Sequence, residues 1–287
     1  MAEPGTPQLV WLITGTSSGF GSALVAAVLA RGDRVIATAR DPARIQHLEG
    51  DPNVCVRQLD VTAGAEALRA IVAEAAGVWG RLDVVVNNAG AGFPGLLEEG
   101  GSDLLRKQFA VNFFGVMDVV AASLPHLRAQ KSGTVVVVGS RSAWKPEIPG
   151  LGPYASSKAA IASLAETLTA ELAPLAIRVL LLEPGAFRTN IYANSFAGRA
   201  IPDYDALRTL SATRFASVSG TERGDPAKAM AAVVDVVRGE GVAQGRPWPG
   251  RLTLGEDAEA DVRAKCKRVL DGMDEWSDVV RGVNFDA

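Results

Sequence analysis

Tyr154 and Lys158 stand four residues apart, separated by Ala155, Ser156 and Ser157. On a helix this spacing places both side chains on one face, within reach of a shared ligand. A phenol with a pKa of about 10 exchanges protons reluctantly at neutral pH, but a nearby ammonium favours the phenolate and lowers that pKa. The pair could therefore act as a general acid or base. The same spacing also occurs by chance in many helices, so the motifs upstream must show whether this pair is functional.

A glycine-rich segment near the N-terminus could bind the phosphates of a dinucleotide. It runs from Thr14 to Gly21, follows an apolar run and opens a helical pattern. Glycines there permit a tight turn and close backbone approach, and the helix N-terminus supplies amide donors and a positive dipole end. The expected cofactor contacts are Gly15, Ser17, Ser18, Gly19, Phe20 and Gly21. The alternative is a glycine-rich turn that holds no ligand.

The end of the second apolar run should select the cofactor. A carboxylate there bonds the ribose 2′-hydroxyl of NAD, whereas an arginine accommodates the 2′-phosphate of NADP. This chain has Ala39 at the expected acidic position, followed by Arg40, whose planar charged fork suits a phosphate. The sequence therefore predicts a preference for NADP(H) over NAD(H). A solvated surface arginine paired with Asp41 is the alternative.

A pair of asparagines ends a later apolar run, in the segment Asn87-Asn88-Ala89-Gly90. In open α/β sheets, ligands bind beyond the carboxyl ends of the strands at the switch point, where asparagine could hold a loop against a cofactor. We expect Asn87, Ala89 and Gly90 to contact the cofactor. A simple Asx turn would explain the same residues.

Short apolar runs alternate with longer amphipathic stretches, which is typical of right-handed βαβ units. Strands are expected at 9–13, 34–38, 54–59, 82–86, 134–138, 177–182 and 251–254, and helices at 21–31, 63–79, 102–129, 154–172, 204–215, 226–238 and 256–272. Continuous Val, Ile and Leu runs indicate strands buried on both faces. The predicted fold is a single α/β domain over 1–287, a doubly wound Rossmann-type parallel sheet of about seven strands with helices on both faces. Its core covers 8–185, and 186–287 supplies a lid, substrate pocket and C-terminal elements.

Composition excludes several classes of protein. The 287 residues carry a formal charge of −3 and are 48% hydrophobic, which does not suggest a nucleic-acid footprint. Cys55 and Cys266 are far apart, so a zinc site or disulfide framework is not expected, and a reducing compartment fits. His47 and His126 have no partner spacing and are expected to be ordinary helix residues, leaving no metal site. Because the chain shows neither a signal peptide nor about 18 consecutive apolar residues, we expect a cytoplasmic protein without a membrane span.

Together these motifs resemble the short-chain dehydrogenase/reductase family over roughly residues 8–190, with fungal-type or retinol- and hydroxysteroid-dehydrogenase-like members the most similar. The resemblance rests on motifs in a fixed order: Thr14 to Gly21, Asp60, Asn87 to Gly90, Asn112, Ser140, Tyr154 with Lys158, and Pro184-Gly185.

The resemblance implies a role for each matching position. Tyr154 would be the general acid in carbonyl reduction and the base in alcohol oxidation, and Lys158 would lower its pKa and bond the nicotinamide ribose. Ser140 would hold the substrate oxygen, and Asn112 would position a water on a proton relay to Lys158. Further cofactor contacts would come from Asp60, Val61 and Val111 at the adenine and from Pro184, Gly185 and Thr189 at the nicotinamide.

The catalytic serine departs from the family spacing. Members usually place it thirteen residues before the tyrosine, where this chain has Arg141. Ser140 is favoured over Ser142 because it lies at the strand end, which is better fixed than a loop; both could also be turn residues. Arg141 could pair with Glu147 or bind an anionic group of the substrate.

Apolar residues in the expected strand-end loops suggest a pocket for a hydrophobic or aromatic carbonyl compound. With Ser142, they are Phe93, Trp144, Phe187, Ile191, Tyr192 and Phe196, which could instead be lid packing or subunit contacts. The expected activity is NADP(H)-dependent interconversion of an alcohol and a ketone or aldehyde. A catalytically silent sensor or scaffold, or an epimerase or dehydratase, remains the alternative. The resemblance also implies a homodimer or homotetramer.

Overall fold

The computed structural model describes residues 7–285, except residues 190, 192–193 and 219. Seven strands form one parallel sheet in the order β3-β2-β1-β4-β5-β6-β7. They are β1 (Val10–Ile13), β2 (Arg34–Ala39), β3 (Val54–Gln58), β4 (Val84–Asn87), β5 (Gly133–Val138), β6 (Ile177–Pro184) and β7 (Arg251–Leu254). The order reverses between β1 and β4, which creates the switch point where ligands bind in such folds. The predicted α/β fold is confirmed.

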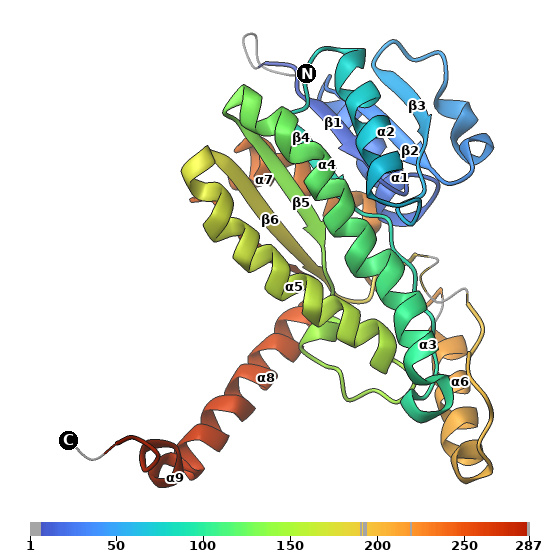
Figure 1. Cartoon of the computed structure of the whole chain (residues 1–287), viewed down its shortest axis with the longest axis vertical. Helices are drawn as coiled ribbons and strands as arrows, with labels where there is room; N and C mark the ends of the chain where they lie inside the picture. Colours follow the sequence, from blue (N-terminus) through green and yellow to red (C-terminus); the bar gives the residue numbers. More distant parts are fainter. Residues whose placement is uncertain (1–6, 190, 192–193, 219, 286–287) are drawn as a thin grey trace.

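Helices cover both faces of the sheet (Figure 1). They are α1 (Gly19–Ala30), α2 (Ala65–Val78), α3 (Leu97–Phe109), α4 (Gly115–Gln130), α5 (Gly152–Leu172), α6 (Asp205–Val218), α7 (Pro226–Arg238), α8 (Glu256–Glu275) and α9 (Ser277–Arg281). One core cluster joins the sheet to α2, α4 and α5, and a second joins it to α1 and α7. Val85 belongs to the first cluster and its neighbours Val84 and Val86 to the second, because successive side chains of a strand point to opposite faces.

The helix expected over 102–129 is longer and is interrupted twice. It begins at Leu97, and Gly101 leaves the helical conformation with φ 53°. A π-helical turn, η2 (Ala110–Phe114), then separates α3 from α4. Such turns are frequent at functional sites, and this one contains Asn112. The terminal helix α9 was not expected, and the short 3₁₀ helix η1 (Pro42–Leu48) contains His47, which was expected on a helix.

Among the described residues, the stretch Leu97–Gln130 has the length and composition of a membrane-crossing helix, with a mean hydropathy of 1.4 in its most apolar window. This differs from the expectation that no segment would pass such a test. Of that window, 44% is buried inside the protein. Its α4 part packs against α2 and the sheet in the first core cluster, so core packing accounts for the apolar composition.

The C-terminal helices form an arm that leaves the body after β7 (Figure 1). In α8 the buried residue Ala258 lies in the first turn, whereas Leu270 and Met273 further along are exposed. Residues 186–287, which were expected to supply a lid, a substrate pocket and C-terminal elements, thus contain both a cavity-lining part and this arm. Within the described part of that segment, the residues that line the large cavity lie between Ala186 and Phe215.

Candidate active site

A cavity of about 570 Å³ opens at the carboxyl ends of the strands. It extends from the loop between β1 and α1, past the ends of β2 and β3, to the first turns of α5 and the loop after β6. This is the position in which a doubly wound sheet binds a dinucleotide. The cavity therefore spans both the loops expected to bind a nucleotide and the turn that carries Tyr154.

The glycine-rich loop has the backbone geometry that phosphate binding requires. Gly15 and Gly19 adopt φ values of 71° and 56°, and a Cβ on Gly15 would lie 2.8 Å from the Cα of Ala89. Ser18 precedes α1 without a side-chain cap, so the first amides of the helix face the cavity uncapped. Gly21 does not line the cavity, and a Cβ there would lie 2.2 Å from the carbonyl oxygen of Gly15. The loop fits a pyrophosphate, with Gly21 serving the packing beneath it.

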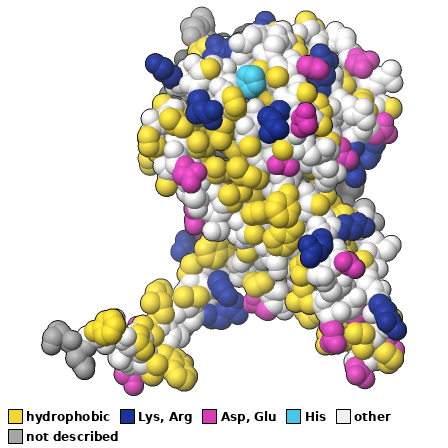
Figure 2. Space-filling view, viewed as in Figure 1, with side chains coloured by type: hydrophobic (Ala, Val, Ile, Leu, Met, Phe, Trp, Pro, Cys, Tyr) yellow, Lys and Arg dark blue, Asp and Glu magenta, His cyan; other side chains and the backbone are white. Residues whose placement is uncertain are grey.

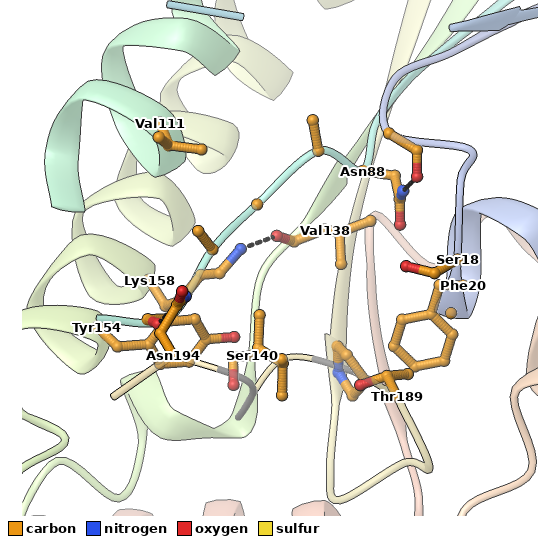
Figure 3. A pocket seen from close by; sticks show the side chains of 18 of the residues that line it. Ser18, Phe20, Asn88, Val111, Val138, Ser140, Tyr154, Lys158, Thr189 and Asn194 are labelled. Carbon is orange, nitrogen blue, oxygen red and sulfur yellow. Dashed lines mark hydrogen bonds between the residues drawn. The ribbon is translucent and has the colours of Figure 1, made fainter. Parts of the chain in front are cut away.

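Asn88, and not Asn87, holds this loop. The Asn88 Nδ2 donates to the carbonyl oxygens of Thr14 at 2.8 Å and Gly15 at 3.0 Å (Figure 3). Asn87 is buried under the sheet end, where its Nδ2 donates to Val136 at 3.4 Å, and it does not line the cavity. The expected cofactor contact of Asn87 is therefore corrected, because alternation along β4 turns its side chain away from the loop.

Two arginines and one aspartate line the end of the cavity beyond β2 and β3. Arg40 and Arg44 both line it, while the Asp41 side chain turns to accept from the Ala43 amide at 3.1 Å. Asp60 accepts from the amide and the hydroxyl of Thr62 at 2.8 and 2.7 Å. Burial raises the pKa of the Asp60 carboxyl, but these bonds and the charge of Arg40 outweigh burial and hold it below its usual value.

Tyr154 and Lys158 lie on the first turns of α5 and face the same end of the cavity. The Lys158 ammonium donates to the carbonyl oxygen of Val138 at 2.7 Å and lies 5.7 Å from the centroid of the Tyr154 ring. Burial lowers the pKa of Lys158 to about 8. Figure 3 shows the Tyr154 hydroxyl directed toward the hydroxyl of Ser140, with the Lys158 ammonium on the far side of the ring. The cavity therefore contains a phenol between a hydroxyl and a buried cation.

Asn112 is fully buried and its amide is bonded to protein groups. Its Oδ1 accepts from the Ala91 amide at 3.0 Å, and its Nδ2 donates to the Ala91 carbonyl at 3.0 Å and to Ser157 Oγ at 3.1 Å. Ser157 in turn donates to the Tyr154 carbonyl at 2.7 Å. The π turn thus aims Asn112 so that it ties the loop after β4 to the first turn of α5.

Ser140 is 7% exposed and its Oγ accepts from the Ser142 amide at 3.1 Å, which caps the short helix η3 (Arg141–Ala143). Both serines line the cavity. Arg141 also lines it, but its Nη1 lies 2.9 Å from a carboxylate oxygen of Asp257 and 2.9 Å from one of Asp261. The expected pairing of Arg141 with Glu147 is wrong, because Glu147 pairs with Arg268 across 2.9 Å.

The residues of the chain match a known family. A comparison with protein families matches residues 9–200 to "short chain dehydrogenase". The oxidoreductase BOA17 of Botryotinia fuckeliana is 36% identical over 275 residues, 94% of this chain and 97% of that protein. The chain belongs to the short-chain dehydrogenase family. It is thus an oxidoreductase of a family whose typical cofactors are NAD and NADP.

Two further relatives extend this finding. A solved short-chain dehydrogenase from Streptomyces avermitilis has 35% identity and a TM-score of 0.83, covering 97% of this chain and all of that one. A 3-ketodihydrosphingosine reductase of Bacteroides thetaiotaomicron is 35% identical over 188 residues, 66% of this chain and 67% of that protein. The match with Botryotinia fuckeliana agrees with the expected fungal-type subgroup.

In this short-chain dehydrogenase the other expected cofactor residues line the cavity. They are Gly15, Ser17, Ser18, Gly19, Phe20, Arg40, Asp60, Val61, Ala89, Gly90, Val111, Pro184, Gly185 and Thr189. Phe93, Ser142, Phe187 and Ile191 line it as well, as expected for pocket residues. Tyr192 lies outside the described residues.

Two expected pocket residues of this dehydrogenase lie elsewhere. The Trp144 Nε1 donates to Glu183 Oε1 at 2.9 Å, and its ring packs under Arg251, outside the cavity lining. Phe196 packs on Phe215 with ring centroids 6.0 Å apart, so it supports a lining residue without being one. The buried carboxylate of Glu183 therefore holds the Trp144 indole beside β6. The position of Trp144 in a loop does not predict this partner.

Sequence reasoning missed several lining residues of this dehydrogenase. They include Arg44, Leu151, Asn194 and Phe215. Arg44 follows Arg40 by only four residues, a spacing that could have indicated a shared phosphate. Asn194 is held by a 2.7 Å bond from its Nδ2 to the Gly92 carbonyl. Among the described residues there is no cluster of three or more metal-ligating groups.

Proposed function

We propose that the chain is an NADP(H)-dependent oxidoreductase that interconverts an alcohol with a ketone or aldehyde. The observation that carries the proposal is the meeting of three groups in one cleft: the Tyr154 hydroxyl, the Ser140 hydroxyl and the buried Lys158 ammonium. A silent cofactor sensor would need only the nucleotide half of this cleft. The retained second half therefore supports turnover over sensing.

Each residue near the reacting end of the cleft has a separate role in the proposed reaction. Ser140 holds the substrate oxygen with its hydroxyl, and Tyr154 delivers the proton to that oxygen in reduction or removes it in oxidation. The charge of Lys158 favours the phenolate form of Tyr154, since an opposite charge stabilises it. Asn112 and Ser157 fix the backbone of the Tyr154 turn. A bound nicotinamide supplies the hydride, and the chain supplies orientation and the proton.

The preference for NADP(H) is supported by charge at the far end of the cleft. Arg40 and Arg44 line it, and Ala39 stands where a carboxylate would bond the ribose of NAD. Asp41 is occupied with its own turn and does not line the cleft. Two guanidinium groups, with no carboxylate at the end of β2 and with Asp60 already bonded to Thr62, suit a 2′-phosphate.

The substrate class is supported by the lining near Tyr154. Apolar surface there comes from Phe93, Leu151, Ile191 and Phe215. Arg141 is already paired with two carboxylates, so it is unsuited to binding a substrate anion. A carbonyl compound with an apolar body fits this lining. One relative is named for reducing the ketone of a sphingoid base, which is a compound of this kind.

Assembly and location complete the proposal. We expect a homodimer or homotetramer, in part because hydrophobic side chains gather over α4 and α5 on the face shown in Figure 2. Leu97 and Phe114 near this face are 56% and 59% exposed. Light scattering should therefore give two or four times the 30.0 kDa of one chain. The two cysteines are free, which is consistent with a reducing, cytoplasmic location.

The test is a fluorescence titration with NADPH and NADH, followed by a panel of aromatic and aliphatic ketones and aldehydes. Tighter binding of NADPH, with loss of the reduced-nicotinamide absorbance on addition of a carbonyl compound, is the expected result. Binding of both nucleotides without turnover of any carbonyl, alcohol or sugar nucleotide would favour the sensor. Turnover of a substrate without net change in NADPH would favour an epimerase or dehydratase.

A further inference from the structure

The first two turns of α8 contact both loops that surround the reacting end of the cleft. Asp257 and Asp261 stand four residues apart and so share one face of α8. The Arg141 Nη1 lies 2.9 Å from an oxygen of each carboxylate, and the Lys145 ammonium lies 2.6 Å from Asp261. These contacts tie α8 to the segment that directly follows Ser140.

Asp257 also bonds the loop after β6. Its Oδ2 accepts from the Ala186 amide at 2.8 Å. A Cβ on Gly185 would lie 2.0 Å from Asp257 Oδ1, and a Cβ on Gly255 would lie 2.8 Å from the same atom. Two glycines and a backbone amide therefore form a seat that the carboxylate fills, so its position is determined by more than a surface ion pair.

The two loops held in this way carry different functions. The turn that begins at Ser140 presents the hydroxyl that faces Tyr154, and the Trp144 and Lys145 amides both donate to the Arg141 carbonyl. The segment from Pro184 to Ala186 lines the cleft at the expected nicotinamide position. Asp257 is bonded to both segments although it is 39% exposed and lies outside the cleft lining.

We propose that Asp257 is a positioning residue that sets the distance between the Ser140 turn and the Gly185–Ala186 loop, with Arg141 as its bridge to the Ser140 turn. This inference rests on the proposed function for the roles of the two loops. An exposed ion pair alone stabilises a protein little, so the expected effect is on alignment rather than on folding. Since a misplacement of about 1 Å costs roughly 10²-fold in rate, a residue outside the cleft can matter for catalysis.

The experiment compares Asp257→Ala, Asp257→Asn and Arg141→Met with a control on the same helix. Asp271→Asn is the control, because Asp271 is also ion-paired, with Lys267 at 2.7 Å, but lies far along the arm. Thermal midpoints are measured first, and all assays are run well below the lowest midpoint. Each variant is normalised to its stoichiometry of NADPH binding.

Asp257→Ala is expected to lower kcat about 10- to 100-fold while the substrate KM changes less than about threefold. Asp257→Asn retains an acceptor for the Ala186 amide. It should therefore bind NADPH as the wild type does, but regain only part of the kcat that Asp257→Ala loses. Arg141→Met should lower kcat, and combining it with Asp257→Asn should add little, because the two residues form one bridge. Wild-type kcat in Asp257→Ala, or full additivity in the double variant, would overturn the proposal.

Hydrogen exchange of the enzyme without cofactor separates this inference from the proposed function. Asp257→Ala should increase exchange in peptides covering 139–146 and 184–188, and Asp271→Asn should not. If the wild type reduces no carbonyl compound but both segments loosen, the proposed function fails and the positioning contact stands. Unchanged exchange in both segments would refute the contact, whatever the activity.

Discussion

The ammonium nitrogen of Lys158 lies 2.7 Å from the carbonyl oxygen of Val138, the last residue of β5. This bond joins α5 to β5, the strand that leads to Ser140. Lys158 is 6% exposed, and burial lowers its pKa to about 8 from an ordinary value of 10.5. Holding a cation there places it beside Tyr154 at a cost in stability, because desolvation disfavours the charged form.

The cost of burying Lys158 should depend on pH. Between about pH 8 and 10.5 the unfolded chain carries the proton and the folded chain does not, so folding gains stability as pH rises through this window. At neutral pH the burial costs about 3 kcal/mol, the equivalent of that shift. In urea denaturation, Lys158→Met should therefore have a higher free energy of unfolding than the wild type at pH 7. This difference should disappear toward pH 10. Lys228→Met, at an exposed site, is the control. A stability difference between Lys158→Met and the wild type that does not change with pH would refute the lowered pKa of Lys158.

Ser140 and Ser142 should separate by mutation. Ser140→Ala removes the hydroxyl that faces Tyr154 and is expected to lower kcat about 10²-fold, the loss typical of one donor to a developing oxyanion. Ser142→Ala should change kcat less than about threefold, because Ser142 contributes its amide to the cap of Ser140 and an alanine keeps that amide. Steady-state kinetics on one carbonyl substrate decides between them. The opposite ranking would assign the substrate oxygen to Ser142.

Arg40→Ala should weaken NADPH binding about 10- to 100-fold and NADH binding less than about threefold, because the 2′-phosphate is absent from NADH. Arg44→Ala should act in the same direction with a smaller effect, since it lies further from the strand end. Fluorescence titration measures both constants, and Arg69→Ala on the exposed side of α2 is the control. Equal weakening of both nucleotides would remove the argument for the phosphate.

The two asparagines at the end of β4 should also differ. Asn88→Ala removes two bonds to the glycine-rich loop, and at about 1 kcal/mol each NADPH affinity should fall roughly 10-fold or more. Asn87→Ala should leave NADPH affinity within about twofold, because that side chain makes one long bond inside the sheet. Loss of affinity in Asn87→Ala alone would restore the expectation drawn from the sequence.

The fold could be predicted because its signals are local and repeated. Each buried strand is a continuous run of apolar residues, and all seven expected strands occur within two residues of their predicted bounds. The helix interruption at Asn112 was not predictable in this way. A π turn keeps the chain helical, so periodicity alone reads α3 and α4 as one helix.

The site was predictable where backbone geometry dictates the residue type, as at Gly15 and Gly19 with their positive φ. It was not predictable where tertiary partners decide. Trp144 turns to Glu183, and Arg141 turns to carboxylates 116 and 120 residues further along the chain. No local pattern in the Ser140 loop predicts that α8 packs against it and brings those carboxylates to Arg141.

The most direct test of the account is the single-turnover reduction of a carbonyl substrate by the wild type and by Tyr154→Phe, each saturated with NADPH. The phenyl ring keeps the packing and the Lys158 neighbour but has no proton to transfer. The account predicts a rate lower by about 10²- to 10⁴-fold, with NADPH affinity unchanged within about twofold. Retention of the full rate in Tyr154→Phe would contradict it, because the proton would then have to come from another group.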